Sequence, residues 1–169
     1  MRNEFSLASV WRVKGTADEV AAILTDAPHL PYWWGEVYLG TKIIAPGDEN
    51  GIGRQVAVHS KGRLPYDLHW TATLVESDLP HRWRITASGD LTGWGEWRID
   101  ENGPMVEARY DWHVTADQPI LRLLSPVLAP VFAWNHRWAM AKGEAGLRRE
   151  LVRRRAVAQQ EMGLHEMVQ

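Results

Sequence analysis

The residue best suited to chemistry in this sequence is His136, which lies within an apolar helical pattern. At about 100° per residue, this pattern places His136 on one face with Phe132 and Met140, shielded from bulk water. Desolvation disfavours the charged imidazole, so we expect a lowered pKa and a neutral ring. A neutral imidazole suits binding of a ligand carbonyl or hydroxyl, or general acid–base catalysis. The alternative is a structural histidine that hydrogen-bonds a loop or strand carbonyl.

The other histidines do not have the spacing of a metal site. They are scattered along the chain, and His69 and His113 share the expected outer side of their strands. The chain has no cysteine, which excludes disulfides and thiolate metal ligands. No serine lies in a nucleophile elbow, and no glycine-rich loop opens a helix after a strand. We therefore expect no metal and no cofactor.

The charge balance gives no electrostatic case for nucleic-acid binding. The chain has 21 acidic and 19 basic residues, for a formal net charge of −2. A basic cluster between Arg148 and Arg155 is interpreted as the solvated end of a helix, where cations suit the helix dipole.

The sequence also indicates a protein without membrane spans. No segment approaches the roughly 20 apolar residues that cross a bilayer. The first residues, MRNEFSLASVWRVKG, contain no apolar stretch like that of a signal peptide. Together with the absence of cysteine, these features favour a cytoplasmic location.

Alternation of side-chain character predicts a sheet. A first strand covers Phe5–Val13, and six more strands are separated by turns rich in Gly, Pro and Asp. We expect these six at Tyr38–Ile44, Gly53–Ser60, Tyr66–Glu76, His81–Ser88, Gly93–Asp100 and Met105–Thr115. Their short connections predict antiparallel hairpins.

In the later strands the alternation separates a covered face from a solvent-exposed face. The covered face carries Leu68, Trp70, Ala72, Leu74, Trp97, Ile99, Val106, Ala108, Tyr110, Trp112 and Val114. The exposed face carries Glu96, Arg98, Glu107, Arg109, Asp111 and His113. The sheet is therefore expected to cover a core on one side only.

Helices are expected at two places. After the first strand, Thr16 and Glu19 have the spacing of a capping box, and a second short helix should carry Leu30–Val37. A long helix should then run from about Val127 to Arg154. The helix face expected to lie on the sheet carries Ala129, Phe132, Ala133, His136, Met140, Gly143, Leu147 and Leu151. Residues 1–155 form one expected domain, and residues 156–169 a flexible tail.

The long helix has a second apolar stripe, roughly opposite His136. Its members are Val127, Val131, Trp134, Trp138 and Ala145. This stripe could pack under the chain's own short helices and loops. It could equally form a partner surface, such as a homodimer through Val131, Trp134 and Trp138, because exposed tryptophan is often part of an interface.

The expected fold class is α+β: a curved seven-stranded antiparallel sheet wrapped around a long C-terminal helix, with two short helices after the first strand. Such a sheet is too large for one helix to fill, which predicts an apolar cavity between them. Ten tryptophans suit a large core or a cavity wall. The candidate ligand-binding residues are Trp70, Trp97, Tyr110, Trp112, Phe132, Asn135, His136 and Met140.

Several segments together carry a resemblance to a known superfamily. They are Pro31-Tyr32-Trp33-Trp34, Lys61–Tyr66 with Trp70, Gly89-Asp90 followed by Gly93, Gly95 and Trp97, Tyr110-Asp111-Trp112, and Asn135–Trp138 with Met140 and Gly146-Leu147. With the element order, they resemble the polyketide cyclase/dehydratase-like branch of the SRPBCC superfamily, which includes START and birch-pollen-allergen-like proteins. The resemblance implies a helix-grip fold and an apolar ligand, over roughly Phe5 to Leu151, and it implies no shared reaction.

Three functions remain open at this point. The first is binding of an apolar small molecule such as a polyketide, lipid or aromatic metabolite. The second is an enzyme that acts on such a ligand by cyclase- or dehydratase-type acid–base chemistry, with His136 as the candidate catalytic residue. The third is a protein-interaction module without a small ligand, which a core filled by the protein's own tryptophans would favour.

Overall fold

The computed structural model describes residues 4–116 and 125–167. The helices and strands in chain order are β1 (Glu4–Lys14), α1 (Ala17–Leu24), the 3-10 helix η1 (Ala27–His29), α2 (Leu30–Trp33), β2 (Tyr38–Ala45), β3 (Gln55–Lys61), β4 (Asp67–Asp78), β5 (Arg82–Gly89), β6 (Leu91–Asn102), β7 (Met105–Ala116) and α4 (Ser125–Met167). This order confirms the predicted α+β class. The predicted helix over Leu30–Val37 is shorter, because α2 ends at Trp33.

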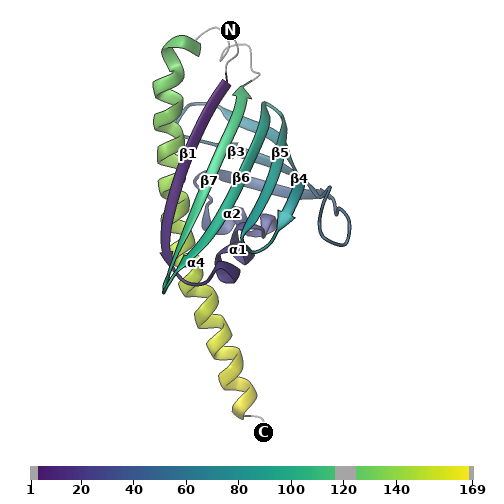
Figure 1. Cartoon of the computed structure of the whole chain (residues 1–169), viewed down its shortest axis with the longest axis vertical. Helices are drawn as coiled ribbons and strands as arrows, with labels where there is room; N and C mark the ends of the chain where they lie inside the picture. Colours follow the sequence, from purple (N-terminus) through teal and green to yellow (C-terminus); the bar gives the residue numbers. More distant parts are fainter. Residues whose placement is uncertain (1–3, 117–124, 168–169) are drawn as a thin grey trace.

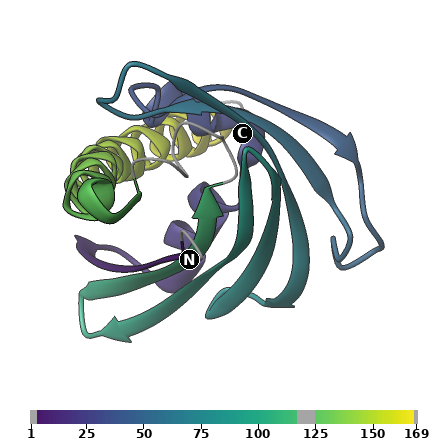
Figure 2. The ribbon, with the colours of Figure 1, turned by 90° about the horizontal axis from the view of Figure 1, so that it is seen from above.

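The seven strands form one antiparallel sheet in the order β1-β7-β6-β5-β4-β3-β2. Consecutive strands from β2 to β7 are neighbours, and β1 pairs with β7, so β1 and β2 are the two edges. Figure 2 shows the sheet curling so that α4 lies in the opening between its two ends. This arrangement is the predicted helix-grip fold.

The start of α1 follows directly from the local sequence. The Thr16 backbone N–H donates to the Glu19 carboxylate, and the Glu19 backbone N–H donates to the Thr16 hydroxyl. This reciprocal capping box, expected from the sequence, satisfies backbone donors that a helix start leaves free. It also fixes Glu19 where α4 can reach it.

Helix α4 is longer than expected, because it continues past Arg154 to Met167. The predicted end of this helix at about Arg154 is therefore wrong. Flexibility of residues 156–169 stays a prediction. In Figure 1 this part of α4 runs on beyond the end of the sheet, and its side chains are exposed. The sequence from Ala156 to Met162 contains no proline and is rich in good helix formers, so nothing in it ends the helix.

The basic cluster of α4 is not simply solvated. Arg154 forms an ion pair with Asp26 at 2.8 Å, and Arg155 forms one with Glu19, also at 2.8 Å. Arg153 and Arg154 also bind Glu150 on the same helix. These pairs tie α4 to the segment that contains α1.

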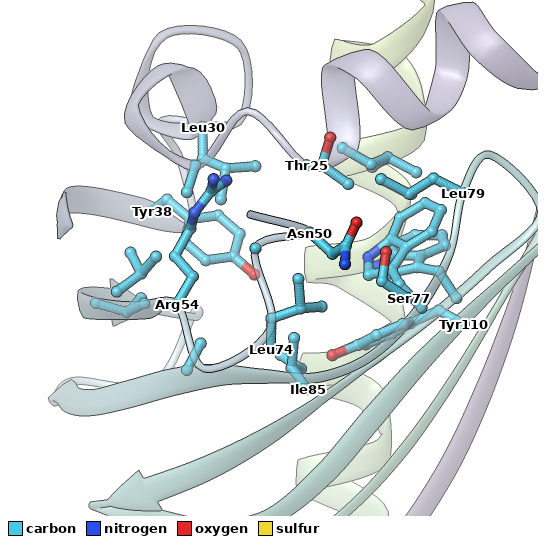
Figure 3. A pocket seen from close by; sticks show the side chains of 18 of the residues that line it. Thr25, Leu30, Tyr38, Asn50, Arg54, Leu74, Ser77, Leu79, Ile85 and Tyr110 are labelled. Carbon is cyan, nitrogen blue, oxygen red and sulfur yellow. The ribbon is translucent and has the colours of Figure 1, made fainter. Parts of the chain in front are cut away.

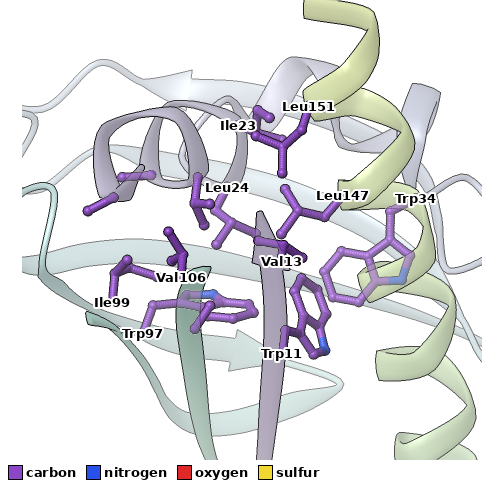
Figure 4. Packing of buried hydrophobic residues seen from close by; sticks show 14 of the residues in the cluster. Trp11, Val13, Ile23, Leu24, Trp34, Trp97, Ile99, Val106, Leu147 and Leu151 are labelled. Atoms are coloured by element: carbon purple, nitrogen blue, oxygen red, sulfur yellow. The ribbon is translucent and has the colours of Figure 1, made fainter. Parts of the chain in front are cut away.

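The larger of two buried clusters lies where α1, β1 and α4 meet (Figure 4). Trp11, Val13, Leu147 and Leu151 are almost completely buried there. The Trp11 ring makes edge contacts with Trp34 and Trp97, with ring centroids 5.2 and 5.0 Å apart. Close approach requires Gly143, because a Cβ at that position would come within 2.6 Å of the Trp34 and Trp11 rings. We call this region the closed end.

A second buried cluster lies on β3, β4, β5 and β7. Its buried members are Val56, Val58, Trp70, Ala87, Trp112 and Val114. The predicted covered face is confirmed by burial of Trp70, Trp97, Ile99, Val106, Ala108, Trp112 and Val114. Its other members, Leu68, Ala72, Leu74 and Tyr110, are partly buried. We call the region around this second cluster the open end. Both cavities described below border it, and the first also borders Leu24, Trp83 and Trp97 of the first cluster.

One residue on the predicted exposed face is buried. Glu96 is only 1% exposed, because Arg82, Arg84 and Arg98 cover its carboxylate. Burial opposes ionisation of Glu96, but hydrogen bonds from the three arginines outweigh it and lower its pKa to about 2. The alternation of side chains correctly predicted the face of the sheet on which Glu96 lies. It did not predict that arginines from β5 and β6 bury this carboxylate.

The helix face expected to lie on the sheet is largely confirmed. Met140, Gly143, Leu147 and Leu151 are buried, and Phe132, Ala133 and His136 are partly buried. Ala129 is exposed, so the prediction is wrong at the start of this face.

Within residues 4–116 and 125–167, no helix is both long enough and apolar enough to cross a membrane.

Candidate functional site

Two adjoining cavities lie between the concave face of the sheet and the helices. The first has a volume of about 320 Å³ and the second about 160 Å³. Trp34, Tyr38, Trp70 and Tyr110 line both of them. Trp34 directly follows α2, and Tyr38, Trp70 and Tyr110 come from β2, β4 and β7. They form a waist between the two cavities.

The first cavity lies under the β2–β3 loop, beside α1 and α2 (Figure 3). Its walls are mostly apolar, with Val56, Leu74, Ile85 and Trp97 among them. Polar groups lie at the loop and strand ends and include Thr25, Asn50, Arg54 and Ser77. An apolar cavity with a few polar groups is the usual form of a small-molecule site.

The second cavity lies between α4 and the strands β1, β4 and β7. Phe132, Asn135, His136 and Met140 of α4 face Phe5, Leu7, Trp70, Tyr110 and Trp112 of the sheet across it. Ser9 of β1 lies close to His136, with 3.3 Å between the serine Oγ and the histidine Nε2. Burial lowers the pKa of His136 to about 4, with a smaller contribution from the Arg137 cation.

These observations refine the sequence interpretation of His136. The lowered pKa was predicted, and the ring is neutral at pH 7. Its polar partner is a serine hydroxyl on β1, whereas the structural alternative expected a backbone carbonyl. A hydroxyl can donate or accept, so a ligand group can replace it at little cost.

A row of aromatic rings forms the floor of both cavities. Trp97 stacks on Tyr110 with 4.6 Å between ring centroids, and Tyr110 stacks on Trp112 at 5.7 Å. Gly95 of β6 makes room for these rings, because a Cβ there would overlap the Tyr110 hydroxyl and the Trp112 ring. This row of stacked rings therefore continues from the first cavity into the second.

Three tyrosine hydroxyls contribute polar groups that stay protonated. Burial raises the pKa of Tyr38 to about 12 and that of Tyr66 to about 12. Burial, with a contribution from the nearby Tyr38, raises the pKa of Tyr110 well above its usual value. These hydroxyls can donate hydrogen bonds to a ligand, but they do not release their protons readily at neutral pH.

Two hydrogen bonds fix the wall of the second cavity. The Trp70 indole N–H donates to the buried Ser60 hydroxyl at 3.0 Å. The Arg63 backbone N–H donates to the Asn135 side-chain oxygen at 2.7 Å, which joins the β3–β4 loop to α4. Gly62 allows this approach, since a Cβ there would overlap the Asn135 amide.

All eight residues proposed from the sequence line one or both cavities. Trp97 lines only the first, Trp70 and Tyr110 line both, and the other five line the second. Whether they contact a ligand stays a prediction. The sequence interpretation missed Trp34, which directly follows α2, and Tyr38, the first residue of β2, because neither belongs to the alternating pattern of the later strands or to the face of the long helix.

The second apolar stripe of α4 is partly covered by the β3–β4 loop. The Arg63 guanidinium lies over the rings of Trp134 and Trp138, 5.4 and 5.9 Å from their centroids. Trp134 remains 43% exposed, and Val131 is partly buried. Of the two alternatives, packing under the chain's own loops therefore holds for part of this stripe. The homodimer through this stripe stays a prediction.

The outer face of the sheet holds histidines but no metal cluster in the part of the chain that the structure describes. His59 and His69 stack with 4.3 Å between ring centroids, and His59 binds Asp67 at 2.9 Å. Among the described residues, no group of three or more His, Cys, Asp or Glu side chains could hold a metal ion.

Solved structures of low sequence identity share this fold. A START superfamily protein from Mycobacterium smegmatis is 14% identical, with a TM-score of 0.72 over 88% of this chain and 97% of its own. A protein from Thermus thermophilus is also 14% identical, with a TM-score of 0.67 over 85% and 97%. The ZhuI aromatase/cyclase from Streptomyces sp. R1128 is 18% identical, with a TM-score of 0.63 over 89% and 95%.

No curated protein matches the chain by sequence. One protein family does match, and it is described as "Polyketide cyclase / dehydrase and lipid transport". The match covers residues 5–152, which is most of the chain and includes every strand together with both cavities. The chain belongs to this polyketide cyclase/dehydrase and lipid transport family, within the SRPBCC superfamily.

Proposed function

We propose that this protein binds an apolar small molecule in the two cavities between the sheet and α4. The observation that carries the proposal is the pair of adjoining cavities, which stay unfilled although ten tryptophans are available. Their aromatic side chains line the space instead of occupying it. Family membership supports the same function, because the family description includes lipid transport.

The chemistry of the polar groups supports binding more strongly than proton transfer. A general base works best with a pKa near the working pH, and the pKa of His136 is lowered to about 4. The raised pKa values of Tyr38 and Tyr110 make these hydroxyls poor acids as well. Neutral donors and acceptors in an apolar cavity suit the orientation of a ligand carbonyl or hydroxyl.

A second candidate function is cyclase- or dehydratase-type chemistry on the bound molecule. The specific observation in its favour is that His136, Ser9 and the Tyr110 hydroxyl lie around the second cavity and its edge. The ZhuI structure, whose fold is similar, is described as an aromatase/cyclase. In this function His136 would require a ligand that raises its pKa towards neutrality.

Titration with Nile red, an uncharged apolar dye, tests the binding proposal directly. We expect saturable binding of one dye molecule per chain, with blue-shifted emission, because the dye would leave water for an aromatic cavity. Native mass spectrometry of the gently purified protein should show a copurified molecule that the dye displaces. No saturable dye binding together with no copurified molecule would contradict the proposal and favour a protein-interaction module.

A further inference from the structure

Hydrogen bonds within the β2–β3 loop hold its conformation at the mouth of the first cavity. Asp48 organises it: its carboxylate accepts hydrogen bonds from the backbone N–H groups of Asn50 and Ile52, both at 2.9 Å. The Asp48 backbone N–H in turn donates to the Ile52 carbonyl at 2.8 Å. Side-chain bonds of this kind stabilise one loop conformation at the expense of others.

Glycines at positive φ allow the loop to turn back over the cavity. Gly47 has φ 75°, and a Cβ there would come within 2.8 Å of three backbone atoms of the loop. Gly53 has φ 83°, and its backbone N–H donates to the Leu74 carbonyl of β4 at 2.8 Å. The Leu74 N–H donates to the Arg54 carbonyl at 3.0 Å, which anchors the end of the loop to the sheet.

A cation lies at this anchored end of the loop. Arg54 is half-buried and lines the first cavity. Its Nε donates to the Pro46 carbonyl at 3.3 Å, which orients the guanidinium. Among the residues that the structure describes, Arg54 forms no ion pair, whereas Arg82, Arg154 and Arg155 all do. Figure 3 shows its side chain extending past Tyr38 towards Leu30.

The surroundings of Arg54 limit the charge of a partner. Glu49, on the same loop, also lines the mouth of the first cavity and is exposed. A doubly charged phosphate would be repelled by this carboxylate, whereas a singly charged carboxylate would be repelled less. A guanidinium also matches the planar geometry of a carboxylate, which it binds with two parallel hydrogen bonds.

We infer that the first cavity takes an apolar organic acid, with its carboxylate on Arg54 at the mouth and its apolar body on the aromatic floor. The inference rests on the proposed binding function and names the chemical class of the ligand. The deeper walls, formed by Leu74, Ile85 and Trp97, suit the apolar body.

Competition against bound Nile red tests this inference with a matched pair of probes, 2-naphthaleneacetic acid and its primary amide. The two differ in charge and hardly in shape. We expect the wild-type protein to bind the acid about tenfold more tightly than the amide at low ionic strength, and added salt to reduce this preference. Equal affinity for the two probes in the wild-type protein would overturn the inference.

Variants of the β2–β3 loop test whether the preference for the acid over the amide depends on Arg54. Arg54→Met keeps much of the side-chain length and removes the charge, so we expect the acid and the amide to bind equally well. Arg54→Lys should retain part of the preference. Glu49→Gln, the control on the same loop, should retain or increase it. A preference for the acid that survives in Arg54→Met would also overturn the inference.

Nile red itself separates failure of the inference from failure of the proposed function. The dye is uncharged, so saturable dye binding by Arg54→Met, at whatever affinity, shows that the variant is folded and keeps a cavity, and the ratio of acid to amide affinity is compared within each variant. Dye binding without a preference for the acid contradicts only the role of Arg54. Absence of dye binding in the wild-type protein contradicts the binding function itself.

Discussion

The closed end and the open end of the molecule are covered by the same sheet and the same helix, yet they are packed differently. At the closed end, Gly143 lets Trp11 and Trp34 approach α4 so closely that a single Cβ would overlap their rings. At the open end, the sheet curves away from α4, and cavities of about 320 and 160 Å³ remain. The close packing of the closed end therefore stabilises the fold, whereas the looser packing of the open end leaves room for a ligand.

The difference depends on which elements meet at each end. At the closed end three elements, α1, β1 and α4, pack together. Ion pairs from Arg154 and Arg155 also join α4 to the segment that contains α1. At the open end, α2 and the β2–β3 loop lie over the first cavity, and only the second cavity faces α4. Short segments and loops cannot fill the space above four strands, so the aromatic side chains become walls.

Truncating one leucine inside the closed end and one leucine that borders the first cavity should give the largest contrast. Leu147→Ala removes a side chain that is completely buried at the closed end. We expect a loss of about 3 kcal/mol in the free energy of unfolding, because the well-packed surroundings cannot collapse into the space. Leu74→Ala, beside the first cavity, should cost about 1 kcal/mol, because that side chain already borders empty space.

Thermal unfolding of the two variants measures this contrast. A loss of about 3 kcal/mol corresponds to a decrease in Tm of about 6–12 °C for a chain of this size. Equal decreases for Leu147→Ala and Leu74→Ala would mean that the two ends are packed alike, which would contradict the comparison.

His136→Phe should weaken recognition of a carbonyl with little effect on the fold. Phenylalanine keeps the ring volume, and among the described residues the polar partner that loses its contact is the Ser9 hydroxyl. We expect the ratio of affinities for 2-acetonaphthone and 2-ethylnaphthalene to fall about tenfold, the size of one buried hydrogen bond. Displacement of Nile red gives both affinities.

A structural role for His136 gives the opposite pattern. The ratio of the two affinities would then stay unchanged, and Tm would fall. Ser9→Ala is the matched control, because it removes the partner hydroxyl while leaving the imidazole in the cavity.

The pH dependence of stability should carry a smaller signal from the same histidine. Burial lowers the pKa of His136 to about 4 in the folded protein, below its usual value of 6.5. The unfolded chain therefore binds the proton more readily between these values, so this contribution to stability is complete above pH 6.5 and is lost as pH falls towards 4. Carboxylates such as Glu96, whose pKa is lowered to about 2, change the stability of the fold mainly below pH 4.5.

Tm measured from pH 7 down to pH 4.5 isolates this contribution. We expect Tm of the wild-type protein to fall more steeply over this range than Tm of His136→Phe. Parallel curves for the two proteins would mean that His136 is hydrated in the folded state.

The fold could be predicted from the sequence because its signals are local. Two-residue alternation in Val106–Val114 gives a strand and its buried face, and the capping box at Thr16 gives the start of α1. Turn residues between strands give hairpins, and hairpins give the order of the sheet. Each of these signals lies within a few residues of the element that it predicts.

The features that were missed depend on distant residues or on side-chain geometry. Burial of Glu96 requires arginines from neighbouring strands, which alternation alone does not bring together. The turn of the β2–β3 loop depends on hydrogen bonds to the Asp48 carboxylate. The eight proposed site residues were found because they point inward, whereas the division into two cavities depends on where Trp34 and Tyr38 lie.

Filling the first cavity tests most directly the claim that the open end is a ligand site. Ala72 of β4 lines this cavity, and Ala57 of the adjacent β3 lies on the opposite face of the sheet. We expect Ala72→Phe to reduce the affinity for Nile red at least tenfold while the protein stays folded, and Ala57→Phe to leave that affinity unchanged. Wild-type affinity for the dye in a folded Ala72→Phe protein, or equal losses in the two variants, would contradict the account.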